Sequence, residues 1–139
     1  GRQEGVEAAF REMGMELDED RVQEGAFNVE AGISAAQKLL ERCPAMDGLL
    51  CATDELAVGA ILYLKAQGKK IPQEIRVAGF GDTPIAQIVE PNLTSVHYYY
   101  KTSGEEAAQL MMNLLETEKP VHKEVKMSFE IVSRESSRG

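Results

Sequence analysis

The sequence has no tryptophan, only two cysteines and two histidines, and no apolar run of membrane-spanning length. A helix needs about 20 apolar residues to cross a bilayer, so the sequence predicts no membrane segment. It also lacks a Gly-x-Gly-x-x-Gly loop that opens a helix and a Gly-Lys-Ser/Thr phosphate loop. Nucleotide binding therefore has little support, and no cofactor is expected.

Positive charge is also scarce, because 15 Lys and Arg face 23 Asp and Glu, for a formal net charge of -8. Such an acidic chain repels a phosphate backbone, so we do not expect this chain itself to bind nucleic acid.

The few cysteines and histidines argue against a metal centre. Cys43 and Cys51 form no Cys-x-x-Cys motif and have no histidine at zinc spacing. Cys51 lies in an apolar run and reads as a small core residue. A disulfide between the two cysteines would need a specific geometry, and two free thiols are the simpler interpretation. Neither His97 nor His122 has a nearby nucleophile pattern, so nothing favours a hydrolase triad.

What the chain does contain is alternating strands and helices. Apolar residues recur at helical spacing over 6–13, 33–40, 57–64 and 107–114. Short strands are predicted at 22–27, 48–52 and 75–80. Strands that alternate with helices in this way predict an α/β fold with a doubly wound parallel sheet.

Local signals place several boundaries within this pattern. Asn28 is expected to cap one helix, and either Thr53 or Asp54 another. Ser103 and Glu106 form a capping-box pair before the last helix. Alternating apolar residues over 125–131 predict a half-exposed strand at a sheet edge. Because the first residues run straight into a helical pattern without an initiating Met, we expect the chain to be part of a longer protein.

Polar residues follow the predicted strands at Asn28, Thr53-Asp54 and Gly81-Asp82. Ligands of open parallel sheets bind beyond the carboxyl ends of the strands. A polar site with an aromatic wall such as Phe27 suits a small polyhydroxylated ligand. Gly81 would let the backbone approach a ligand closely or take a conformation that other residues avoid. An enzyme using Asp54 and Asp82 as an acid–base pair is conceivable, although Asp54 could equally serve as a helix cap.

Residues 52–111, "ATDELAVGAILYLKAQGKKIPQEIRVAGFGDTPIAQIVEPNLTSVHYYYKTSGEEAAQLM", carry many short motifs in order. Together with the Arg-x-x-Gly at Arg2 and the ending "SRESS", they resemble the lactose/galactose repressor (LacI/GalR) family of bacterial regulators. The resemblance covers nearly the whole chain and implies the C-terminal part of a two-lobed, type I periplasmic-binding-protein-like core. It implies one lobe over 1–92, a crossing and helix of the other lobe over 93–123, and a final strand and tail over 124–139.

The resemblance also implies site residues. Those expected to contact a sugar effector are Arg2, Phe27, Thr53, Asp54, Gly81, Asp82 and Tyr100. A homodimer interface is expected at Leu56, Ile85, Ile88 and Val89. The plainer alternatives are a surface role for Arg2, a core role for Phe27, and burial within the lobe for the interface residues.

Two positions depart from the family pattern. Thr53 stands where the family commonly has Asn, and Gly81 replaces the first acid of its Gly-Phe/Tyr-Asp-Asp motif. A site built to hydrogen-bond particular hydroxyls discriminates sharply, so the loss of this acid should change the ligand. The Gly-Phe-Gly variant and "VHYYYKTSG" are most similar to the sucrose-operon repressor branch.

The resemblance predicts a cytoplasmic, sugar-responsive transcriptional regulator that is not an enzyme. DNA would be bound only through an N-terminal helix-turn-helix headpiece that this sequence does not include. A sugar-binding receptor of a transport system with the same fold is the alternative. If the lobes divide as expected, the helix near 98–116 lacks its packing partners, and it should be exposed, repositioned or covered by a neighbouring chain.

Overall fold

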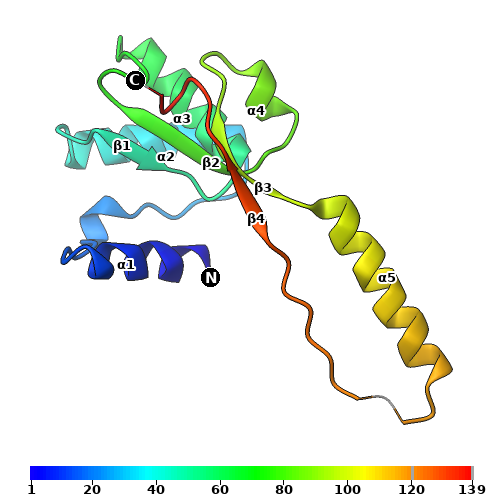
Figure 1. Ribbon diagram of the computed structural model, residues 1–139. Helices are drawn as coiled ribbons and strands as arrows, with labels where there is room; N and C mark the ends of the chain where they lie inside the picture. Colours follow the sequence, from blue (N-terminus) through cyan, green and yellow to red (C-terminus); the bar gives the residue numbers. More distant parts are fainter. Residues whose placement is uncertain (120, 139) are drawn as a thin grey trace.

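The computed structural model describes residues 1–119 and 121–138. Its elements, in chain order, are α1 (Arg2–Glu12), a short 3-10 helix η1 (Glu19–Arg21), α2 (Val29–Arg42), β1 (Gly48–Leu50), α3 (Asp54–Ala66), β2 (Arg76–Gly81), α4 (Ile85–Ile88), β3 (Thr94–Tyr98), α5 (Tyr100–Glu116) and β4 (Phe129–Val132) (Figure 1). Within the described residues, no helix combines the length and apolar character that crossing a bilayer requires.

The four strands form one sheet in the order β1-β2-β3-β4. The pairs β1–β2 and β2–β3 are parallel, whereas β3–β4 is antiparallel. The α/β fold with a mainly parallel sheet is therefore confirmed, and so is the edge position of the last strand. That strand begins at Phe129 and not at Val125, because Phe129 pairs with Tyr98 and the chain beyond Tyr98 turns into α5.

The core lies between the sheet and the helix pair α2–α3. Its fully buried apolar side chains include Ile61, Leu64, Ile75, Val77 and Leu93. Both predicted caps form: the Asn28 side chain accepts from the Ala31 N–H at 2.8 Å, and Thr53 Oγ1 accepts from the Leu56 N–H at 3.3 Å. Thr53, and not Asp54, is thus the cap of α3.

The backbones of α2 and α3 approach closely through two glycines. A Cβ at Gly59 would lie 2.1 Å from the Val29 carbonyl oxygen, and one at Gly32 would lie 2.3 Å from the Leu56 carbonyl oxygen. Separations this short leave no room for a side chain between the helices. The two glycines therefore set how closely α3 lies against α2.

One predicted strand is absent: Val22–Phe27 joins none of the four strands of the sheet. The Val22 carbonyl accepts instead from the Arg42 side chain at 3.3 Å. Gln23, Glu24 and Gly25 interrupt the apolar residues of this segment, and a glycine inside a short strand weakens it. The strand prediction was wrong here.

The helix α5 projects away from the sheet, and none of its residues is buried (Figure 1). Its apolar stripe is open, with Met111 58% and Leu115 76% exposed. The expected exposure of this helix is confirmed. The predicted start of this helix was wrong. The helix α5 begins at Tyr100, three residues before Ser103, so the Ser103–Glu106 pair lies inside the helix and does not cap its N-terminus.

Both cysteines are free thiols, Cys43 half-buried and Cys51 buried within the core. Burial, reinforced by the Asp54 carboxylate, raises the pKa of the Cys51 thiol to about 12. Because the thiolate is the nucleophile, we expect iodoacetamide at pH 8 to label Cys43 in the native protein and Cys51 only after unfolding. Peptide mass mapping with and without urea checks this, and rapid native labelling of Cys51 would contradict it.

Candidate effector site at the carboxyl edge of the sheet

Asp54 is the first residue of α3 and is completely buried beside the carboxyl end of β2. Its Oδ2 accepts from the Thr83 N–H at 2.7 Å and from Thr83 Oγ1 at 2.9 Å. Its Oδ1 accepts from Ser95 Oγ at 2.5 Å. The carboxylate thereby ties α3 to β3 and to the turn after β2. We call the ends of β1 and β2 with the residues that follow them, 51–54 and 80–83, the carboxyl edge.

Gly79 and Gly81 make room for this buried carboxylate. A Cβ at Gly79 would lie 2.6 Å from Asp54 Oδ1, and one at Gly81 would lie 3.2 Å from Asp54 Oδ2. Gly81 also has φ +132°, a conformation that residues with side chains rarely adopt. The expected need for a special backbone at Gly81 is confirmed. This conformation favours glycine over a residue with a side chain at position 81.

Asp82 is held on both of its oxygens. Arg134 Nη2 donates to its Oδ1 at 2.5 Å, and His97 Nδ1 lies 3.0 Å from its Oδ2. Its backbone N–H donates to Ser95 Oγ at 3.0 Å. Asp82 has a φ of +51°, which is uncommon for a residue other than glycine, so these contacts hold a turn of restricted geometry.

Arg2 and Tyr100 reach the carboxyl edge from distant parts of the chain. Arg2 Nη1 donates to the carbonyl oxygen of Ala52 at 2.8 Å, and its guanidinium carbon lies 5.5 Å from the ring centroid of Phe80. The Tyr100 hydroxyl donates to the carbonyl oxygen of Gly81 at 2.9 Å. Desolvation of this hydroxyl and the neighbouring Asp54 carboxylate raise its pKa.

Of the predicted effector residues, the structure thus gathers Arg2, Asp54, Gly81, Asp82 and Tyr100. Thr53 lies at the same edge, with its hydroxyl engaged in capping α3. Phe27 is 69% exposed in the loop before α2, and among the described residues no ring contact or hydrogen bond joins it to the others.

Sequence reasoning missed four residues of this arrangement, namely Phe80, Ser95, His97 and Arg134. Phe80 could have been found, because it is an aromatic residue directly before Gly81. The other three lie on β3 or after β4, and nothing local in the sequence marks them as partners of Asp54 or Asp82.

The predicted interface residues differ in exposure. Ile88 of α4 is 78% exposed, whereas Leu56 and Val89 are half-buried and pack against the core. Ile85 is half-buried as well. Ile88 therefore offers the most accessible apolar surface of this set.

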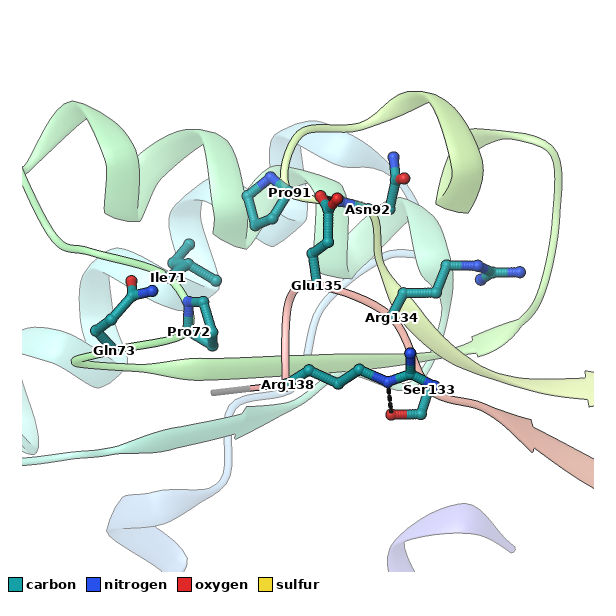
Figure 2. A pocket seen from close by; sticks show the side chains of 9 residues that line it. All are labelled: Ile71, Pro72, Gln73, Pro91, Asn92, Ser133, Arg134, Glu135 and Arg138. Atoms are coloured by element: carbon teal, nitrogen blue, oxygen red, sulfur yellow. Dashed lines mark hydrogen bonds between the residues drawn. The ribbon is translucent and has the colours of Figure 1, made fainter.

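A depression of about 530 Å³ lies at the other end of the sheet (Figure 2). It is lined by residues 71–73, which precede β2, residues 91–92, which precede β3, and residues of the C-terminal tail. Most of these segments are at the amino ends of the strands, and Arg134, which also lines the depression, is the residue that reaches from it to Asp82 of the carboxyl edge. Over the described part of the chain, no cluster of three or more His, Cys, Asp or Glu side chains could hold a metal ion.

The chain matches the family model for a periplasmic binding protein-like domain over residues 1–137. It is 34% identical to the transcriptional regulator CelR of Thermobifida fusca over 86% of this chain and 36% of that protein. It is 29% identical to the repressor CytR of Escherichia coli K12 over 99% of this chain and 40% of that protein. The chain thus spans about two fifths of the length of these curated relatives.

Solved structures agree with these sequence relatives. A CelR–cellobiose complex superposes with a TM-score of 0.90 at 33% identity, over 98% of this chain and 42% of that chain. The regulator CcpA of Lactococcus lactis gives a TM-score of 0.88 at 31% identity, over 99% of this chain and 50% of that chain. The chain therefore belongs to the periplasmic binding protein-like domain family, and the relatives and solved structures that it resembles include LacI-family transcriptional regulators.

Proposed function

We propose that this chain is the effector-binding and dimerisation region of a sugar-responsive transcriptional regulator. The observation that carries the proposal is the meeting of Arg2 and Tyr100 at the carboxyl edge, where Arg2 contacts the Ala52 carbonyl oxygen just after β1 and Tyr100 contacts the Gly81 carbonyl oxygen at the end of β2. A guanidinium beside an aromatic ring suits a ligand that has hydroxyl groups and an apolar ring face. Cellobiose bound to CelR, a relative of the same fold, supports this ligand class.

Within the proposal, the predicted contacts take different roles. Arg2, Phe27, Thr53 and Tyr100 contact the effector directly. Asp54 and Asp82 shape the turn that carries Gly81, because their oxygens are already engaged by internal donors. These internal contacts give both carboxylates a structural part in the site, which supports a binding function.

The proposed protein is a homodimer in the cytoplasm, with Leu56, Ile85, Ile88 and Val89 at or near the interface. It binds DNA through a segment other than this acidic chain. The proposal keeps the predicted division, with one lobe over 1–92, a crossing and helix of the other lobe over 93–123, and a final strand and tail over 124–139. The curated relatives described above are regulators, which favours this function over a transport receptor. Membership of the sucrose-operon branch stays a prediction.

The test is isothermal titration of the complete natural chain with a panel that includes cellobiose and sucrose, combined with an operator-release assay. One sugar should bind and change operator affinity, because a ligand shifts two arrangements only by its differential affinity for them. Arg2→Gln should weaken that sugar about tenfold or more, since it removes a charged donor.

Arg11→Gln is the matched control, because Arg11 is an exposed arginine on the same helix, α1. It should leave sugar affinity unchanged. Binding of no sugar together with no operator binding would rule the function out, and an equal loss in both variants would place the effector elsewhere.

A further inference from the structure

Asp82 contacts both of the strands that connect the sheet to α5. His97, on its Oδ2, belongs to β3, which leads the chain out to α5. Arg134, on its Oδ1, comes two residues after the end of β4, which brings the chain back (Figure 1). The Asp82 carboxylate therefore contacts both β3, which leads to α5, and the segment directly after β4, which returns from α5.

Arg134 is fixed at more points than this ion pair. Its Nη1 donates to the Leu93 carbonyl oxygen at 2.7 Å, and its backbone N–H donates to Thr94 Oγ1 at 2.8 Å. The side chains of Arg134 and Asp82 are 16% and 10% exposed. A pair so shielded from water is screened much less by salt than a surface pair, and its planar donor fork favours one geometry.

The segment after Arg134 adds a second attachment between β2 and β3. Ser136 is completely buried; its hydroxyl donates to the Val77 carbonyl oxygen at 2.6 Å and accepts from the Thr94 N–H at 2.8 Å. This attachment holds the tail in place without Asp82. Loss of the Arg134 side chain should therefore free the turn while leaving the tail docked.

We propose that Arg134 is a positioning residue for the effector site: through Asp82 it fixes the turn 80–83 and sets that turn's placement against β3 and β4. The inference rests on the proposed function, because the turn matters as an effector site only if a ligand binds there. Arg134 itself does not contact the ligand. Its effect reaches the ligand through Gly81, whose carbonyl orients Tyr100.

Hydrogen exchange on the ligand-free complete chain tests the positioning directly. In Arg134→Gln, the amides of Asp82 and Thr83, which donate to Ser95 and Asp54, should exchange about tenfold faster or more. Amides inside α3 should keep their wild-type rates, which separates a local effect from global destabilisation. Arg138→Gln is the matched control, an exposed tail arginine whose side chain, among the described contacts, bonds only Ser133.

Two further variants keep the test decisive. Arg134→Lys retains the charge but replaces the two guanidinium nitrogens that bond Asp82 and Leu93 by a single ammonium, so the exchange at 82–83 should be intermediate. If Arg134→Gln does not fold, Arg134→Lys serves as the test variant. Asp82→Asn should give the same local pattern, and combining it with Arg134→Gln should add little, because each acts through the other. Additive effects, or unchanged exchange at 82–83, would overturn the proposal.

Sugar titration of the same proteins separates this inference from the proposed function. If exchange rises locally in Arg134→Gln but no sugar binds the wild type, the positioning role of Arg134 in the turn stands and its effector role fails. If a sugar binds both proteins with equal affinity, the effector role of Arg134 is overturned although the chain binds sugars.

Discussion

Gly59→Ala should lower the free energy of unfolding by about 3 kcal/mol, near the upper end of what overpacking a core usually costs. The added methyl would lie 2.1 Å from the Val29 carbonyl oxygen and 2.8 Å from the Ile33 nitrogen. Both are backbone atoms of α2, so no side chain can rotate away, and the two helices must separate. Urea unfolding and thermal melting of the complete chain measure the change, with an expected fall in Tm of roughly 10 °C.

Gly104→Ala is the control for this variant. Gly104 also lies within a helix, α5, but a Cβ there would meet nothing within 4 Å. Alanine is the better helix former by about 1 kcal/mol, so this variant should be neutral or slightly stabilising. The difference between the two variants isolates the contact between α2 and α3. Equal melting curves would show that the helices are not in contact at Gly59.

Asp54→Ala should also cost about 3 kcal/mol, because it leaves buried donors without an acceptor. The Thr83 N–H, the Thr83 hydroxyl and the Ser95 hydroxyl all donate to this carboxylate. Thr83 is the residue that closes the turn carrying Gly81. Thermal unfolding should therefore show a lower Tm, and hydrogen exchange should rise most at the amide of Thr83.

Asp54→Asn should lower the free energy of unfolding by about half as much as Asp54→Ala. Comparing the two variants separates the hydrogen bonds of this side chain from its filling of the space. Its amide oxygen can still accept from Thr83, and its NH₂ group can donate to Ser95 Oγ, since a hydroxyl has two acceptor lone pairs. Asp47→Ala, at an exposed position that contacts β2 only through its backbone, should change stability by less than about 0.5 kcal/mol. An Asn variant as damaged as the Ala variant would contradict this account of the network.

Sequence reasoning succeeded where the deciding interaction is local. Asn28 and Thr53 lie three residues before the amides that they cap, so their role follows from type and position. Gly81 similarly marks its own backbone requirement. The exposure of α5 could also be anticipated, because its apolar stripe has no predicted partner among the strands of the chain.

Prediction from the sequence failed where the structure of a segment depends on a partner far along the chain. Val22–Phe27 has strand-like residues at both ends, but whether it pairs depends on a neighbouring strand that the segment cannot specify. Arg134 lies 52 residues from Asp82, and Ser136 lies 59 residues from Val77. Their side chains bridge elements whose proximity arises only once the sheet has formed, so no spacing rule reveals them.

The crowded glycine at position 81 also constrains how this protein can evolve. Elsewhere in the family an acid at this place helps to choose the ligand, as the resemblance implies. Here any side chain would have to adopt φ +132°, and its Cβ would lie 3.2 Å from Asp54 Oδ2, so that carboxylate would have to shift by a few tenths of an ångström. Because a side chain at position 81 meets both an unfavourable backbone conformation and the Asp54 carboxylate, changes of ligand preference are expected at neighbouring positions such as Arg2 and Tyr100.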